Sequence, residues 1–151
     1  MATKQEIVQA LIVAYNKEVE TVINYLSVSI DIDGVRADFI KQALIADIMG
    51  EITHAKQIGA RIKQLGGQVP GSLGMKMEQS YLQPLADTTD VQTVIKGVLA
   101  AEHDAISHYN KLIKMCEGTD YVTQDLAITI LSDEEGHRQT FEGYLKEYTR
   151  G

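Results

Sequence analysis

The chain has 151 residues, of which 44 % are hydrophobic and 23 % charged, as expected for one soluble globular domain over residues 1–151. Its formal net charge of −7 and its lack of a basic tail argue against a nucleic-acid partner. The single cysteine, Cys116, excludes an intrachain disulfide, and no apolar run reaches the ~18–20 residues of a membrane span. We therefore expect a cytoplasmic protein with no membrane contact.

Apolar residues recur at helical spacing in four stretches, which predict helices over residues 4–31, 35–65, 90–116 and 121–148. Glycine-containing turns separate the first helix from the second and the third from the fourth. Between residues 66 and 90 two prolines and several glycines break the pattern, leaving room only for a short helix near residues 75–82. The sequence thus predicts an all-α four-helix bundle with a long crossover between helices 2 and 3, and no fifth helix.

The predicted inward stripes are mainly aliphatic. Their members are Ile7, Leu11, Tyr15, Val22, Tyr25 and Leu26 in the first helix, Ile40, Leu44, Ile48, Ala55, Ile58 and Ile62 in the second, Ile95, Val98, Ala105, Ile106, Tyr109 and Leu112 in the third, and Ile128, Leu131, Phe141 and Leu145 in the fourth.

The two halves of the chain also resemble each other. The stretch from Glu18 to Tyr25 aligns with that from Glu102 to Tyr109, and Glu51-x-x-His54 aligns with a second Glu-x-x-His, each 83 or 84 positions later. A helical hairpin repeated at a nearly constant offset predicts a pseudo-twofold bundle, in which a site on the axis is built from both copies.

Six ionisable residues interrupt the apolar stripes. They are Glu18, Glu51, His54, Glu102, Glu134 and His137. Each histidine lies one turn after a glutamate, so the two side chains share a helix face. One such glutamate would ordinarily reach solvent at the edge of a stripe. Four at matching depth, together with two histidines, indicate a metal site, because a buried carboxylate is very costly unless it is paired or metal-bound.

This ligand set is the one described for di-iron and di-manganese carboxylate bundles: one glutamate from each of two helices and a Glu-x-x-His from each of the other two. Four carboxylates neutralise two divalent ions, and each imidazole adds one nitrogen. Such oxygen-rich ligation suits iron(II) or manganese(II) and leaves coordination positions open for an oxidant. We therefore predict two iron ions per subunit, with manganese as the alternative metal.

The motifs resemble those of the ferritin-like superfamily, and most closely those of bacterioferritins. Glu18 with Tyr25, Glu51-x-x-His54, Glu102 and the stretch Ile130-Leu-Ser-Asp-Glu-Glu-Gly-His137 carry the resemblance. It implies that the six residues are ferroxidase ligands, with Glu51 and Glu134 bridging the two metals. The role of Tyr25, as a donor of an electron or of a hydrogen bond, or as a packing residue, stays open.

Three features depart from the bacterioferritin pattern. Ile52 stands where those proteins have the haem methionine, which argues against haem. Ala46 and Gly50 occupy the positions of a second, inner-surface iron site. Too few residues follow His137 for a fifth helix. In this respect the chain resembles the twelve-subunit DNA-protecting Dps proteins, which favours twelve subunits over twenty-four.

We therefore expect a ferroxidase that oxidises iron(II) with dioxygen or hydrogen peroxide inside a shell-like homo-oligomer, for iron storage and protection from oxidative stress. Two alternatives stay open: a non-storage di-metal peroxidase or manganese catalase, and a Dps-like, DNA-associating shell protein. Among the remaining polar residues, we expect His103 and His108 at the surface, and Glu20, Asp133 and Glu135 facing away from the ligands.

Overall fold

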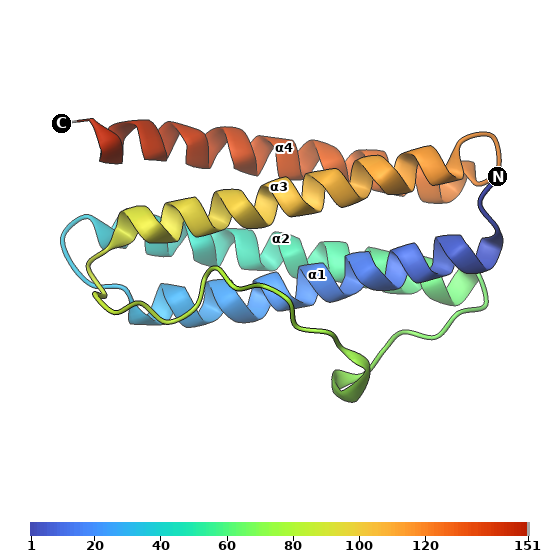
Figure 1. The fold of residues 1–151 in the computed structure, drawn as a ribbon, viewed down its shortest axis with the longest axis horizontal. Helices are drawn as coiled ribbons and strands as arrows, with labels where there is room; N and C mark the ends of the chain where they lie inside the picture. The colour runs from blue at the N-terminus through green and yellow to red at the C-terminus, as the bar shows by residue number, and fades with distance from the viewer. Residues whose placement is uncertain (151) are drawn as a thin grey trace.

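The computed structural model describes residues 1–150, and its helices form a four-helix bundle. Helices α1 (Lys4–Asp31) and α2 (Ala37–Gln64) form one antiparallel hairpin, and α3 (Val91–Cys116) and α4 (Tyr121–Thr149) form the other (Figure 1). The predicted all-α bundle is confirmed, with helix ends within two residues of those expected. None of the described helices combines the length and the apolar character that crossing a bilayer requires.

Side chains satisfy the free backbone groups where three of the helices begin. Thr3 and Glu6 form a reciprocal capping box at the start of α1. Asp90 and Asp120 accept the backbone N–H groups of Thr93 and Thr123 at the starts of α3 and α4. These caps explain why the helices begin where polar residues precede the apolar stripes.

The apolar core is divided into two clusters, one toward each end of the bundle. One cluster takes residues from the C-terminal half of α1 and the first halves of α2 and α3, including Tyr25, Leu44 and Ile95. The other takes residues from the opposite halves of those helices, including Leu11 and Leu112. The glutamates and histidines singled out above lie between the two clusters along every helix, so the fold places them at mid-height in the bundle.

The crossover between α2 and α3 runs along the bundle and contains only a 3-10 turn, η1 (Ser72–Gly74) (Figure 1). The short helix for which the sequence left room near residues 75–82 is not formed, and the segment is a long connection as expected. Instead, the backbone N–H groups of Glu78 and Gln79 donate to the carboxylate of Glu20 on α1 at 2.7–2.9 Å. These amides are therefore held by a side chain of another segment rather than by a helical turn. Glu20, expected to face away from the ligands toward solvent or a subunit contact, is instead buried against the crossover, at 6 % exposure.

Three further expectations about exposure were wrong. Leu26 and Ile128 lie outside the core, at 51 % and 48 % exposure. Val28 and Ile32, the residue that follows α1, complete the core at that end of the helix. Ala127 and Ile130 complete that of α4, one and two positions from Ile128. His108 is half-buried, with Nε2 2.8 Å from the carbonyl oxygen of Ala10.

Candidate metal centre

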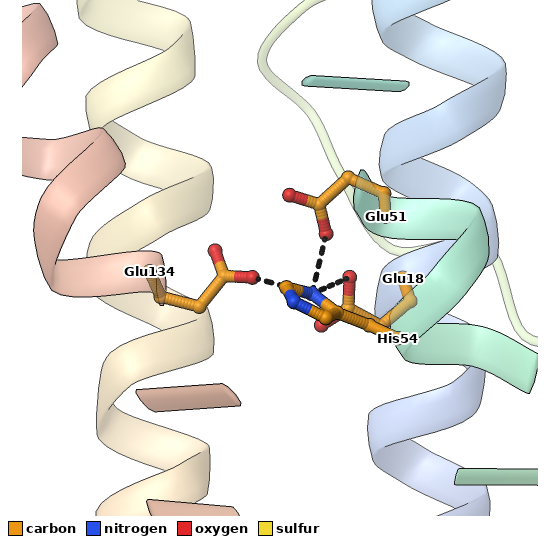
Figure 2. Close-up of side chains that lie close together, drawn as sticks. All are labelled: Glu18, Glu51, His54 and Glu134. Atoms are coloured by element: carbon orange, nitrogen blue, oxygen red, sulfur yellow. Dashed lines mark ion pairs between the residues drawn. The ribbon is translucent and has the colours of Figure 1, made fainter. Parts of the chain in front are cut away.

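The structure brings all six predicted ligands together at the centre of the bundle. In one group, ligand atoms of Glu18, Glu51, His54 and Glu134 all lie within 4.8 Å of one another. Figure 2 shows their side chains converging from α1, α2 and α4, with the His54 ring between the carboxylates. His54 Nδ1 lies 3.1 Å from Glu134 Oε1 and 3.6 Å from an oxygen of each of Glu18 and Glu51.

A second group shares two of these residues. Ligand atoms of Glu51, Glu102, Glu134 and His137 also lie within 4.8 Å of one another. His137 Nδ1 is 3.6 Å from Glu51 Oε1, 3.7 Å from Glu102 Oε1 and 3.9 Å from Glu134 Oε2. Two neighbouring four-residue groups therefore exist, and Glu51 and Glu134 belong to both.

Each of the six residues has one ligand atom that lacks a hydrogen bond. One oxygen of each of the four glutamates and Nδ1 of both histidines are buried without a hydrogen bond: Glu18 Oε2, Glu51 Oε1, Glu102 Oε2, Glu134 Oε1, His54 Nδ1 and His137 Nδ1. Buried polar groups are almost always satisfied in folded proteins. Six orphan atoms converging on one volume fit a pair of divalent cations, which would coordinate all of them.

Electrostatics in the metal-free centre also favour cations. Burial raises the pKa of Glu51 to about 7. Burial, followed by contact with Glu134, raises the pKa of Glu102 to about 12. Burial would lower the pKa of His54, but contacts with Glu134, Glu51 and Asp133 outweigh it and raise that pKa to about 11. Without metal, Glu51 and Glu102 thus tend to hold protons and His54 stays protonated, whereas for Glu134 burial is outweighed by contacts with Glu102 and His54, which lower its pKa. A divalent ion would replace those protons.

A second set of carboxylates touches the outer edges of the two histidines. Asp133 Oδ2 lies 2.9 Å from His54 Nε2, and Asp47 Oδ1 lies 3.7 Å from His137 Nε2. The Asp133 acceptor favours the His54 tautomer with the proton on Nε2, which leaves the Nδ1 lone pair for a metal. The Asp47 contact with His137 is longer than a hydrogen bond. Neither contact was predicted from the sequence, and the expectation that Asp133 faces away from the ligands was wrong. The position of Asp133 could have indicated that it contacts His54, because the residue just before a ligand glutamate can reach a ligand on the neighbouring helix.

The two halves of the centre differ in exposure. The side chain of His54 is 4 % exposed and that of His137 24 %. Solvent therefore reaches part of the His137 ring, although its Nδ1 is buried, while His54 is almost fully enclosed.

Two buried tyrosines contact the centre in a crossed arrangement. Tyr25 of α1 donates a hydrogen bond to Glu102 Oε1 of α3 at 3.1 Å. Tyr109 of α3 donates one to Glu18 Oε1 of α1. Burial and the neighbouring carboxylates raise both phenol pKa values well above the usual range, so both tyrosines act as neutral donors. Tyr25 was predicted to lie at the site, whereas Tyr109 was expected only in the apolar core.

Comparison with known proteins gives one family match. Residues 8–151 match the family described as the ferritin-like domain. A DNA protection during starvation protein from Pyrococcus furiosus is 25 % identical over 143 residues, covering 93 % of this chain and 77 % of that protein. A bacterioferritin from Rhodobacter capsulatus is 31 % identical over 101 residues, covering 66 % of this chain and 58 % of that protein.

Solved structures share the fold. A dodecameric thioferritin from Bacteroides fragilis, described as bacterioferritin-related, superposes with a TM-score of 0.88 at 23 % identity. The match covers 99 % of this chain and 89 % of that one. The Rhodobacter capsulatus bacterioferritin superposes with a TM-score of 0.80 at 24 % identity, covering 98 % and 88 % of the two chains.

Proposed function

This chain belongs to the ferritin-like domain family, and we propose that it is a ferroxidase that binds two iron(II) ions per subunit and oxidises them. The observation that carries the proposal is the convergence of six buried, unpartnered ligand atoms in two overlapping groups. A polar network that serves only to stabilise the fold leaves few atoms without a hydrogen bond. Free lone pairs that face one another are what a pair of cations requires.

The residues have distinct roles in this proposal. Glu51 and Glu134, which belong to both groups, would bridge the two ions, while Glu18 and Glu102 would each bind one. His54 and His137 would each bind one ion through Nδ1. Four carboxylates balance the charge of two iron(II) ions, and the positive charge gained on oxidation is stabilised in a site that buries the carboxylates.

The electrons balance with either oxidant. Two iron(II) ions give one electron each, which reduces dioxygen with two protons to hydrogen peroxide, or hydrogen peroxide with two protons to two waters. The donor chemistry also suits manganese(II), which is the alternative metal. Because His137 is the more exposed histidine, we propose that iron and oxidant enter on that side.

We further propose that the subunits form a closed shell that stores the oxidised iron and consumes peroxide. One of the fold relatives is described as dodecameric. Exposed apolar side chains of α1 and α2 support assembly, because Leu26, Ile45 and Met49 are 51–64 % exposed. Contiguous exposed apolar side chains commonly mark protein–protein contacts. Twelve subunits are favoured over twenty-four, and the expected cytoplasmic location stays a prediction.

Iron oxidation by the purified protein tests the site. Glu18→Ala and Glu51→Ala are expected to abolish rapid oxidation, followed by iron(III) absorbance after anaerobic loading, while Glu135→Ala on the exposed face of α4 leaves it unchanged. Oxidation by either ligand variant at the rate of the parent protein would show that the site is wrongly assigned.

Light scattering with metal analysis on the same fractions tests storage. A shell that carries more than two irons per chain is the expected result. A dimer with two metals per chain would contradict storage and favour the non-storage peroxidase or manganese catalase. The name of the Pyrococcus relative supports the Dps-like alternative, and the net charge of −7 opposes it. An electrophoretic shift of DNA at physiological salt would support it.

A further inference from the structure

The two buried tyrosines each occupy one oxygen of a glutamate and leave the other free. Tyr109 donates to Glu18 Oε1, while Glu18 Oε2 is buried without a partner. Tyr25 donates to Glu102 Oε1, while Glu102 Oε2 is buried without a partner. Each phenol thus holds its carboxylate in one orientation and leaves a single oxygen for a cation.

The two glutamates also divide between the two ligand groups. Glu18 belongs only to the group with His54, and Glu102 only to the group with His137. By contrast, Glu51 and Glu134 belong to both groups. A change in the orientation of Glu18 would therefore act on one ion, and a change in Glu102 on the other.

We propose that Tyr109 is a positioning residue for the metal ion on the His54 side and Tyr25 for the ion on the His137 side, so that the two phenols control the two halves of the centre separately. This inference rests on the proposed function, because it requires that both groups bind metal. The pseudo-twofold repeat gives a physical reason: each tyrosine lies seven residues after one of the two glutamates and hydrogen-bonds the other.

A packing role makes a different prediction. Tyr25 and Tyr109 are fully buried in the two apolar clusters, so each ring also fills core volume. Phenylalanine keeps that ring and removes only the hydroxyl. If the tyrosines only pack, phenylalanine leaves metal binding unchanged. If they position carboxylates, removing the donor loosens the ligand, a kind of change that typically costs about 10- to 100-fold in metal affinity.

Two backgrounds separate the halves of the site in the full-length chain. His137→Ala leaves the Glu18 group complete, and His54→Ala leaves the Glu102 group complete. Each background is combined with Tyr25→Phe, Tyr109→Phe or the control Tyr15→Phe, because Tyr15 is half-buried and its hydroxyl hydrogen-bonds none of the six ligands. Cobalt(II) is the probe. Calorimetry gives its affinity, and the visible d–d spectrum reports its coordination.

The expected result is crossed selectivity. Tyr109→Phe should weaken cobalt binding by about tenfold or more and alter the spectrum in the His137→Ala background, with little effect in the His54→Ala background. Tyr25→Phe should do the reverse, and Tyr15→Phe should change neither.

The failures are distinguishable. If the parent protein binds fewer than two cobalt ions per chain, the proposed function fails and this inference falls with it. If the parent binds two but each phenylalanine affects both backgrounds equally, or neither, the inference alone is overturned.

Discussion

Asp133 Oδ2 contacts Nε2 of His54 at 2.9 Å, on the edge of the imidazole opposite the ligand glutamates. This contact fixes both the rotation of the ring and the nitrogen that carries the proton. Although the Asp133 side chain is 55 % exposed, the histidine it holds is only 4 % exposed. A surface residue therefore controls the orientation of a buried ligand.

Replacing Asp133 should weaken metal binding without removing a ligand. We expect Asp133→Ala to lower the affinity for manganese(II) by about 10- to 100-fold, because His54 loses the acceptor that selects its tautomer. Calorimetric titration measures the change. The control is Glu135→Ala, which removes the same charge from the exposed face of the same helix. Equal effects of the two variants would mean that charge, not contact with His54, is responsible.

The raised pKa of Glu51 makes the stability of the metal-free protein depend on pH. The pKa of Glu51 is about 7 in the folded protein against a usual value of 4.5. The stability contributed by its protonated form is therefore fully present below pH 4.5 and is lost as pH rises through 7. Glu51→Gln stays neutral at every pH. We expect the variant to become more stable than the parent as pH rises from 4.5 to 7, by up to about 3 kcal/mol.

Urea denaturation of both metal-free proteins at several pH values measures this difference. The matched control is Glu135→Gln, whose carboxylate is exposed and should give a pH-independent difference. A constant difference between Glu51→Gln and the parent across this range would show that Glu51 is ionised throughout.

Glu20 should be needed to hold the crossover against α1. Its carboxylate accepts hydrogen bonds from the backbone N–H groups of Glu78 and Gln79 and is almost fully buried. Glu20→Ala leaves these groups without their acceptor, and we expect a loss of roughly 1–3 kcal/mol in the free energy of unfolding.

Hydrogen exchange localises the effect. The amides of Glu78 and Gln79 should exchange faster in Glu20→Ala, while Glu20→Gln, which retains one acceptor oxygen, should show a smaller increase. Unchanged protection of these two amides would contradict the role given to Glu20.

The exposed apolar face of α1 and α2 should be required for assembly. Leu26→Glu places a charge on this face without entering the core, because Leu26 is 51 % exposed. We expect the variant to remain helical by circular dichroism but to form smaller particles by light scattering. Gln139→Glu, on an exposed position of α4, is the control. Full-size assembly of Leu26→Glu would exclude this face as a subunit contact.

The sequence was most informative where several constraints coincided. The repeated spacing of four glutamates and two histidines predicted their convergence, because residues at matched heights on antiparallel helices meet in the interior. Helix ends were predicted well where an acceptor such as Thr3 or Asp120 caps the first turn. The roles of the six residues as metal ligands stay a prediction.

Contacts between distant segments could not be predicted. Glu20 looked like a solvent residue because its partners are backbone amides 58 and 59 positions away. Leu26 looked like a core residue because helical spacing identifies a wide apolar face but not which part of it packs inside the subunit. Likewise, which glutamate receives the Tyr109 hydroxyl depends on the offset between α1 and α3.

Each ligand group draws on both hairpins. Glu18, Glu51 and His54 come from the first hairpin and meet Glu134 from the second, while Glu102, Glu134 and His137 come from the second and meet Glu51 from the first. Each bound ion would therefore cross-link one hairpin to the other, at an interface where the buried glutamates would otherwise repel one another. The first two ions taken up by a subunit would make the bundle more rigid before any iron could be stored. A chelator would remove these cross-links.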